Sequence, residues 1–142
     1  MQYFYVEPEV AGGLGENTLM DRTVHPPIVS KLHYEFDGWG GDALLESFPC
    51  FIVTEGAKKK LQSVGLTGIA FDKALVTTSD LFQEIYPNRK LPKFVWLQVV
   101  GRPGQDDFGI AKDLRLVTSE RALNVLEGHG ISNAVVEPYK DG

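Results

Sequence analysis

The stretch Phe51-Ile52-Val53-Thr54-Glu55-Gly56-Ala57 organises this chain, because Leu116-Val117-Thr118-Ser119-Glu120-Arg121-Ala122 repeats its pattern 65 residues later (116 minus 51). In both copies a β-favouring run leads into a hydroxyl residue, which a glutamate follows. The register then continues without a gap, so that Leu61 falls on Leu126, Gly65 on Gly130, Leu66 on Ile131 and Thr67 on Ser132.

Each copy has the pattern of a strand followed by a capped helix. Thr54 and Ser119 can each accept a hydrogen bond from an unpaired amide at a helix start, and the glutamate after each one meets the positive end of the helix dipole. Gly65 and Gly130 suit the position that ends a helix. These features predict a strand–helix–strand unit used twice, over residues 51–71 and 116–136. The repeat reflects either an internal duplication or two ordinary elements that follow the same rules.

The remaining chain predicts more strands than helices. Lys93–Val100 is the strongest strand and is expected inside a sheet, and Ile28–Phe36 predicts one continuous strand of alternating faces. Gly12–Gly15 predicts a surface loop, and Ala43–Phe48 one helical turn. Short helices and strands that follow one another directly predict an α+β fold with a mixed or mainly antiparallel sheet. We expect a single α+β domain over residues 1–142.

Composition excludes several classes of protein. Hydrophobic residues make up 43% of the 142 residues and charged residues 23%, as in ordinary globular domains and unlike disordered chains. The net charge of -5 argues against a nucleic-acid partner. No apolar run is long enough to span a bilayer, and Cys50 is the only cysteine, which fits a reducing compartment. These features predict a cytoplasmic protein that binds neither nucleic acid nor membrane.

Residues suited to catalysis are few and scattered along the sequence. Cys50 follows Pro49 without a recognisable basic partner, and the three histidines lack the spacing of a metal site. We therefore predict no catalytic residue, no metal and no cofactor. The alternative is a small enzyme or ligand-binding domain with a cleft near Cys50, His33 or the pair Asp106 and Asp107.

An acidic patch around one tryptophan is the predicted partner-binding site. Trp39 lies between two glycines in a turn, where a large ring has no strand or helix face to bury it. It is either a plug on the core or a contact residue, since tryptophan is favoured as an interface anchor. With Asp37, Asp42 and Glu46 it would present an acidic rim to a basic protein, and complementary charge speeds association.

The two repeated segments also carry a resemblance. The pattern Phe-Ile-Val-Thr-Glu … Gly-Leu-Thr-Gly-Ile, echoed by Leu-Val-Thr-Ser-Glu-Arg-Ala … Gly-Ile … Val-Glu-Pro-Tyr, resembles a group of small uncharacterised bacterial proteins. More distantly it is similar to immunity proteins of bacterial polymorphic toxin systems. Leu116–Pro138 carries the likeness best, and residues 51–71 carry it in part. The resemblance implies a cytoplasmic protein that binds and blocks a toxin domain without catalytic residues. A third reading is a domain that pairs with itself through an exposed strand edge.

Overall fold

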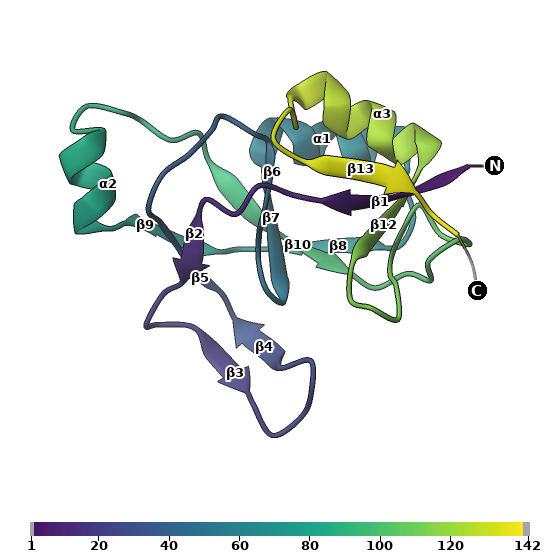
Figure 1. Ribbon diagram of the computed structural model, residues 1–142, viewed down its shortest axis with the longest axis horizontal. Helices are drawn as coiled ribbons and strands as arrows, with labels where there is room; N and C mark the ends of the chain where they lie inside the picture. Colours follow the sequence, from purple (N-terminus) through teal and green to yellow (C-terminus); the bar gives the residue numbers. More distant parts are fainter. Residues whose placement is uncertain (1, 141–142) are drawn as a thin grey trace.

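A computed structural model describes residues 2–140 of the chain and confirms an α+β fold dominated by antiparallel strands (Figure 1). Among these residues no helix is both long and apolar enough to cross a membrane. The strands are β1 (Tyr3–Glu7), β2 (Gly12–Leu14), β3 (Leu19–Asp21), β4 (Ile28–Lys31), β5 (His33–Phe36), β6 (Leu44–Ser47), β7 (Cys50–Thr54), β8 (Ile69–Asp72), β9 (Leu75–Thr78), β10 (Phe94–Val99), β11 (Phe108–Ile110), β12 (Leu116–Ser119) and β13 (Val135–Pro138). The helices are α1 (Glu55–Val64), α2 (Asp80–Ile85) and α3 (Glu120–His129).

Two four-stranded sheets share one arrangement. Their orders are β6-β7-β10-β8 and β11-β12-β1-β13, and every neighbouring pair in them is antiparallel. In each sheet a hairpin pairs its second strand with an inner strand from elsewhere in the chain, and the strand after the helix forms the far edge. The inner strand β10 follows in sequence the segment 44–72 that supplies the other strands of its sheet. The inner strand β1 precedes the segment 108–138 that supplies the other strands of its own sheet. We call β6-β7-α1-β8 and β11-β12-α3-β13, each with its hairpin, the two units of the fold. They share local structure and strand order, while a duplication as their origin stays a prediction.

Both predicted helix caps are confirmed. The Thr54 hydroxyl accepts a hydrogen bond from Ala57 N, and the Ser119 hydroxyl accepts one from Ala122 N, each at 3.2 Å. α1 ends at Gly65, whose φ of 75° and ψ of 38° lie in the left-handed region that glycine enters at little cost. α3 ends at Gly130, where φ is also positive at 96° but ψ is 103°, so the chain leaves this helix along a different path.

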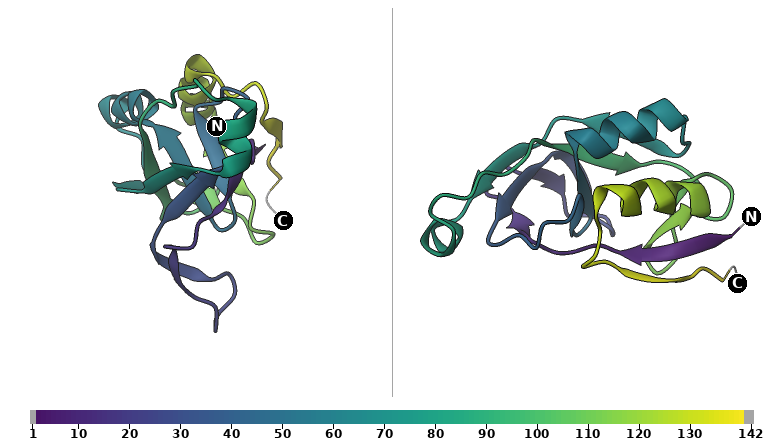
Figure 2. Two further views of the ribbon diagram at one scale, coloured as in Figure 1. Left: turned by 90° about the vertical axis from the view of Figure 1, so that its left-hand side faces the viewer. Right: turned by 90° about the horizontal axis from the view of Figure 1, so that it is seen from above.

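The sheet β6-β7-β10-β8 separates two hydrophobic cores. On one face lies the first core, in which Val53 and Val95 join buried side chains of α1, α3 and the second sheet. α1 and α3 lie side by side over this core (Figure 2). On the other face lies the second core, in which Ile52 and Trp96 pack against the sheet β2-β5-β9 and α2. Because successive side chains of a strand point to opposite faces, the apolar run Phe94–Leu97 of β10 can serve both cores.

Three local expectations are wrong. Ala43–Phe48 contains strand β6 and no helical turn, and the Gly12–Gly15 segment contains strand β2, which pairs with β5. The run Ile28–Phe36 breaks at Leu32 into β4 and β5, which belong to different sheets. At the break, the Thr18 hydroxyl accepts a hydrogen bond from His33 N and donates one to His33 O. The side chain of Thr18 thus makes hydrogen bonds to the His33 backbone of the kind that a paired strand would make. Val29 before the break packs with the same core as Leu32, Tyr34 and Phe36 after it, so the alternation of faces in the sequence does not continue through the break.

Candidate functional site

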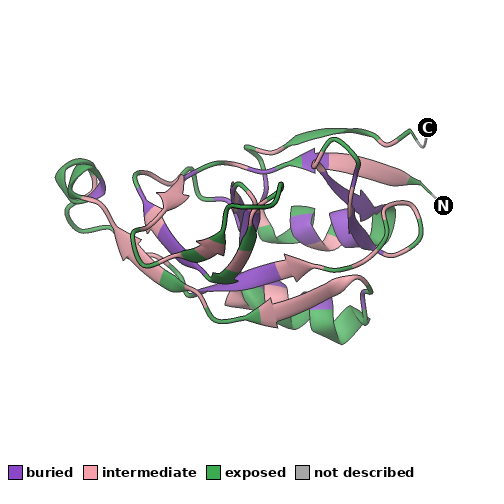
Figure 3. Cartoon of the chain, turned by 90° about the horizontal axis from the view of Figure 1, so that it is seen from below, coloured by how far each residue is buried: buried purple, intermediate pink, exposed green. Residues whose placement is uncertain are grey.

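The hairpin of β3 and β4 projects from the body of the protein as an arm, defined here as residues 19–31 (Figure 1). Its two strands form a sheet of their own. Leu19, Val24 and Ile28 are 58%, 43% and 62% exposed, and Figure 3 colours most of the arm as exposed. Val29 packs in the opposite direction, against the second core. Apolar side chains gathered on one projecting element are typical of a surface that meets a partner.

A groove runs between the arm and the two large sheets. It consists of two adjoining cavities of about 220 Å³ and 80 Å³ that share Pro26, Pro49, Phe51 and Ile110 as walls. Phe48 lies at the smaller cavity, is 45% exposed, and has its ring 6.1 Å from that of His25 on the arm. We call these two cavities the arm groove. Its walls come from the arm, from the β6–β7 hairpin, from β10 and from β11, so it exists only in the folded chain.

Glu46 is the acidic side chain that lines the arm groove. It is half-buried, and burial raises the pKa of its carboxyl group, with the negative charge of Glu7 raising it further. Within residues 2–140 its carboxylate forms no hydrogen bond and no ion pair. A carboxylate held beside apolar walls and a second negative charge is stabilised by an approaching cation.

The four residues of the predicted acidic patch do not form one surface. Asp42 is only 2% exposed, and its carboxylate accepts hydrogen bonds from Asn133 N at 2.9 Å and from Asn133 Nδ2 at 3.0 Å. Asp37 is exposed. Leu45 packs in the second core together with Trp39. Glu46, the next residue of β6, points to the opposite face of the strand. The predicted patch is therefore split by the sheet, and Glu46 alone lines the groove.

Trp39 packs as a plug on the second core. Its indole N–H donates to Asp42 O at 2.9 Å, and its ring meets that of Phe94 edge to face at a centroid distance of 6.0 Å. The Arg89 guanidinium lies 4.7 Å from the ring on the outside and donates a hydrogen bond to Trp39 O. These contacts use both the polar and the apolar parts of the side chain.

We therefore expect Trp39→Ala to lower the free energy of unfolding by about 2 kcal/mol, because it removes a half-buried ring and leaves a void against Phe94. Urea denaturation followed by far-UV circular dichroism measures the loss. The control is Leu81→Ala. Leu81 is an exposed side chain on α2, beside the second core, and its replacement should change the free energy of unfolding by less than about 0.5 kcal/mol. Equal stabilities of the Trp39 variant and the parent would show that the ring is not a plug.

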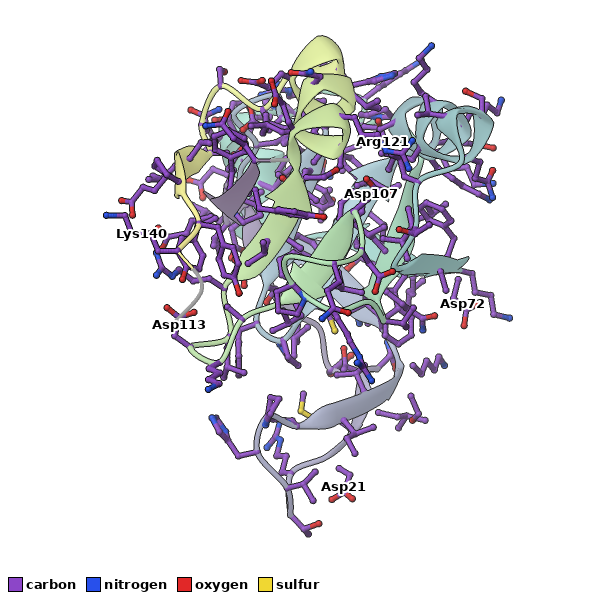
Figure 4. All side chains as sticks on the ribbon, turned by 90° about the vertical axis from the view of Figure 1, so that its right-hand side faces the viewer. Asp21, Asp72, Asp107, Asp113, Arg121 and Lys140 are labelled. Atoms are coloured by element: carbon purple, nitrogen blue, oxygen red, sulfur yellow. The ribbon has the colours of Figure 1, made fainter. Side chains whose placement is uncertain are left out.

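Asp107 is the most fully bonded side chain among the predicted candidates. It is 5% exposed and accepts hydrogen bonds from Arg121 Nε at 2.8 Å and Arg121 Nη2 at 2.7 Å, from the Ser119 hydroxyl at 2.6 Å, and from Thr67 N at 2.9 Å. Figure 4 shows Arg121 and Asp107 facing one another. The pKa of this carboxyl is held well below its usual range, chiefly by the Arg121 hydrogen bonds. Its neighbour Asp106 instead accepts from Arg102 N at the surface.

The other candidates of a reactive cleft are also occupied by structural contacts. The Cys50 thiol lines the larger cavity but is buried, and burial raises its pKa to about 12, which suppresses the reactive thiolate. The buried ring of His33 contacts the Thr77 hydroxyl through Nε2 and accepts from Asn17 N through Nδ1. In the described part of the chain, no three His, Cys, Asp or Glu side chains gather as metal ligands. Cys50, His33 and Asp107 are not brought into contact with one another.

One signal in the sequence pointed to these contacts and was missed. The 65-residue offset that relates the two helices also relates Asp42 to Asp107. Each aspartate precedes the hairpin of its own unit and accepts a hydrogen bond from the loop after the other unit's helix, Asp107 from Thr67 N and Asp42 from Asn133 N. Both are therefore buried links between the two units. The walls of the arm groove had no such signal, because they come from four segments that are distant in the sequence.

Comparison with known proteins assigns the chain to no family. No model of a protein family matches the sequence, and no curated protein matches it either.

Proposed function

We propose that this chain is a non-enzymatic protein-binding module. In this proposal it is an immunity-type inhibitor that binds a basic toxin domain in the cytoplasm and occludes it. The arm is the single observation that carries this proposal. Leu19, Val24 and Ile28 stand uncovered on a hairpin from which only Val29 packs against a core. Exposed apolar groups concentrated on a projection gain most when a partner removes them from water.

The charge and the internal bonding of the chain support the same proposal. A net charge of -5 favours encounters with a basic partner and raises the association rate at low salt. The buried acidic groups Asp42 and Asp107 are held by hydrogen bonds within the fold. They link the two units that carry the first core, and an ordered scaffold lowers the entropic cost of binding.

Affinity capture with matched arm variants tests the proposal. Tagged parent protein is incubated with lysate of the source organism beside a double variant, Leu19→Asp with Ile28→Asp. The control is Val100→Asp with Val135→Asp, two exposed apolar side chains outside the arm. We expect a basic protein retained in stoichiometric amount by the parent and the control and lost from the arm variant, because a buried aspartate opposes the apolar contact.

Growth of cells that express the captured protein then tests inhibition. Co-expression of the parent should restore growth, and co-expression of the arm double variant should not. A captured protein that binds parent and arm variant equally would contradict the role of the arm. The alternative of a small enzyme or ligand-binding domain would be favoured if no protein is retained and a metal or metabolite screen raises the melting temperature of the parent.

A further inference from the structure

The arm groove has the chemistry of a site for one cationic side chain. Apolar walls from Pro26, Phe51 and Ile110 lead to the half-buried carboxylate of Glu46, with Glu7 close enough to act on its charge. We propose that the groove binds a segment of the partner protein in which a lysine or arginine is flanked by apolar residues. In this arrangement the cationic head group pairs with Glu46. The inference rests on the proposed function and names the feature of the partner that is recognised.

The lining of the groove, apolar walls with one carboxylate, suits a long basic side chain better than a purely apolar one. Lysine and arginine carry an aliphatic stem that packs on apolar surface while the charged end reaches a polar group. The walls would cover the stem, and the carboxylate at the smaller cavity would receive the head group. A wholly apolar segment would instead bury Glu46 without a partner, which is unfavourable for a charged group.

No cation among residues 2–140 pairs with Glu46. Arg115, on which the charge of Glu7 acts, is bound to Asp113 at 2.8 Å and faces Glu137, and its guanidinium stacks 3.6 Å from the Tyr5 ring. The remaining titratable group that senses Glu46 is Tyr34, whose buried phenol has a pKa raised to about 12 and so stays neutral. Among the described residues, therefore, the carboxylate of Glu46 has no cationic partner, whereas the charge of Glu7 acts on Arg115.

A second copy of this chain is a poorer occupant than a basic partner. Two copies of net charge -5 repel each other, whereas a basic domain is attracted to the same surface. Charge complementarity thus selects the partner class, and the apolar walls select the neighbours of the basic residue.

Selection from a library of random dodecamer peptides displayed on phage tests this inference without the natural partner. On immobilised parent protein we expect enriched peptides with a lysine or arginine between apolar residues. A synthetic copy of one enriched peptide is then measured by fluorescence anisotropy. Its affinity should fall at least tenfold with Glu46→Gln, and likewise when its basic residue is replaced by norleucine. Glu127→Gln, an exposed glutamate on α3, is the control and should leave the affinity unchanged.

Three results of the peptide and sedimentation measurements would overturn the inference. They are a library without enriched basic peptides, a peptide whose affinity Glu46→Gln leaves unchanged, and a homodimer in sedimentation that Glu46→Gln dissolves. The melting temperature of Glu46→Gln should equal or exceed that of the parent, since the change removes an unpaired half-buried charge, so loss of binding is separable from unfolding. Capture of a partner that depends on the arm but not on Glu46 would overturn this inference alone. Peptide binding that depends on Glu46, with no partner captured, would instead count against the proposed function.

Discussion

Replacing Asp107 with alanine should lower the free energy of unfolding by about 3 kcal/mol, the largest loss we expect from any polar side chain of the protein. The change leaves the Arg121 guanidinium, the Ser119 hydroxyl and Thr67 N without their common acceptor. Ser119 also caps α3, and Thr67 follows α1, so the loss falls on the contact between the two units. Chemical denaturation at pH 7 measures it.

The pH dependence of stability gives an independent check on Asp107. Because its folded pKa lies below its value in the unfolded chain, protonation favours unfolding. The stabilisation is complete above the unfolded pKa of about 4 and is lost as the pH falls through the folded value. The difference in unfolding free energy between the parent and Asp107→Asn should therefore be widest near neutral pH and narrow below about pH 4.

Asp106→Asn is the matched control for both measurements. Asp106 precedes Asp107 directly, but its carboxylate accepts a hydrogen bond from a backbone amide at the surface. We expect a loss below about 1 kcal/mol for this variant. If Asp106→Asn and Asp107→Ala destabilise the protein equally, the assignment of Asp107 as the link between the two units is wrong.

Truncating the matched leucines of the two helices should be comparably costly. Leu61 on α1 and Leu126 on α3 occupy equivalent positions in the repeat, and both are fully buried in the first core. Leu61→Ala and Leu126→Ala should each lower the free energy of unfolding by about 3 kcal/mol, because each leaves a cavity that close-packed neighbours fill only in part.

Urea denaturation of the two variants compares the two halves of the fold directly. Val64→Ala on α1 is the control, since this side chain is 36% exposed, and it should cost less than about 0.5 kcal/mol. A large loss for one leucine and almost none for the other would show that only one of the two units contributes to the shared core.

The helical parts of the fold were predictable because their signals are local. A hydroxyl at the cap and a glutamate in the first turn act within a few residues of each other, and α1 and α3 begin as predicted at Glu55 and Glu120. The position of Lys93–Val100 as a strong inner strand was predictable from its apolar β-favouring composition and is confirmed by β10. The break at Leu32 was not, because it depends on Thr18 and on strands that pair with β5 from distant parts of the chain.

The candidate site was predictable only in part. Glu46 was selected together with Trp39 because both lie in an acidic, turn-rich segment, yet the sheet places them on opposite faces. Residues 28–31 of the arm were assigned to a continuous strand and residues 19–24 to no element, and so the exposed apolar residues of the arm went unrecognised. Periodicity shows which residues share a face, but it does not show whether another element covers that face.

By itself, the sequence determined the capped helices, the apolar faces of the strands and the acidic balance of the chain, because these depend on neighbouring residues and on composition. Only the tertiary structure decided that β10 pairs with β7 and β8 while β1 pairs with β12 and β13, that Asp107 binds Arg121, and that Glu46 lines a groove beneath the arm. The physical reason is that each of these features joins residues far apart in the chain. Such contacts form where many side chains pack together at once, and no local pattern specifies them.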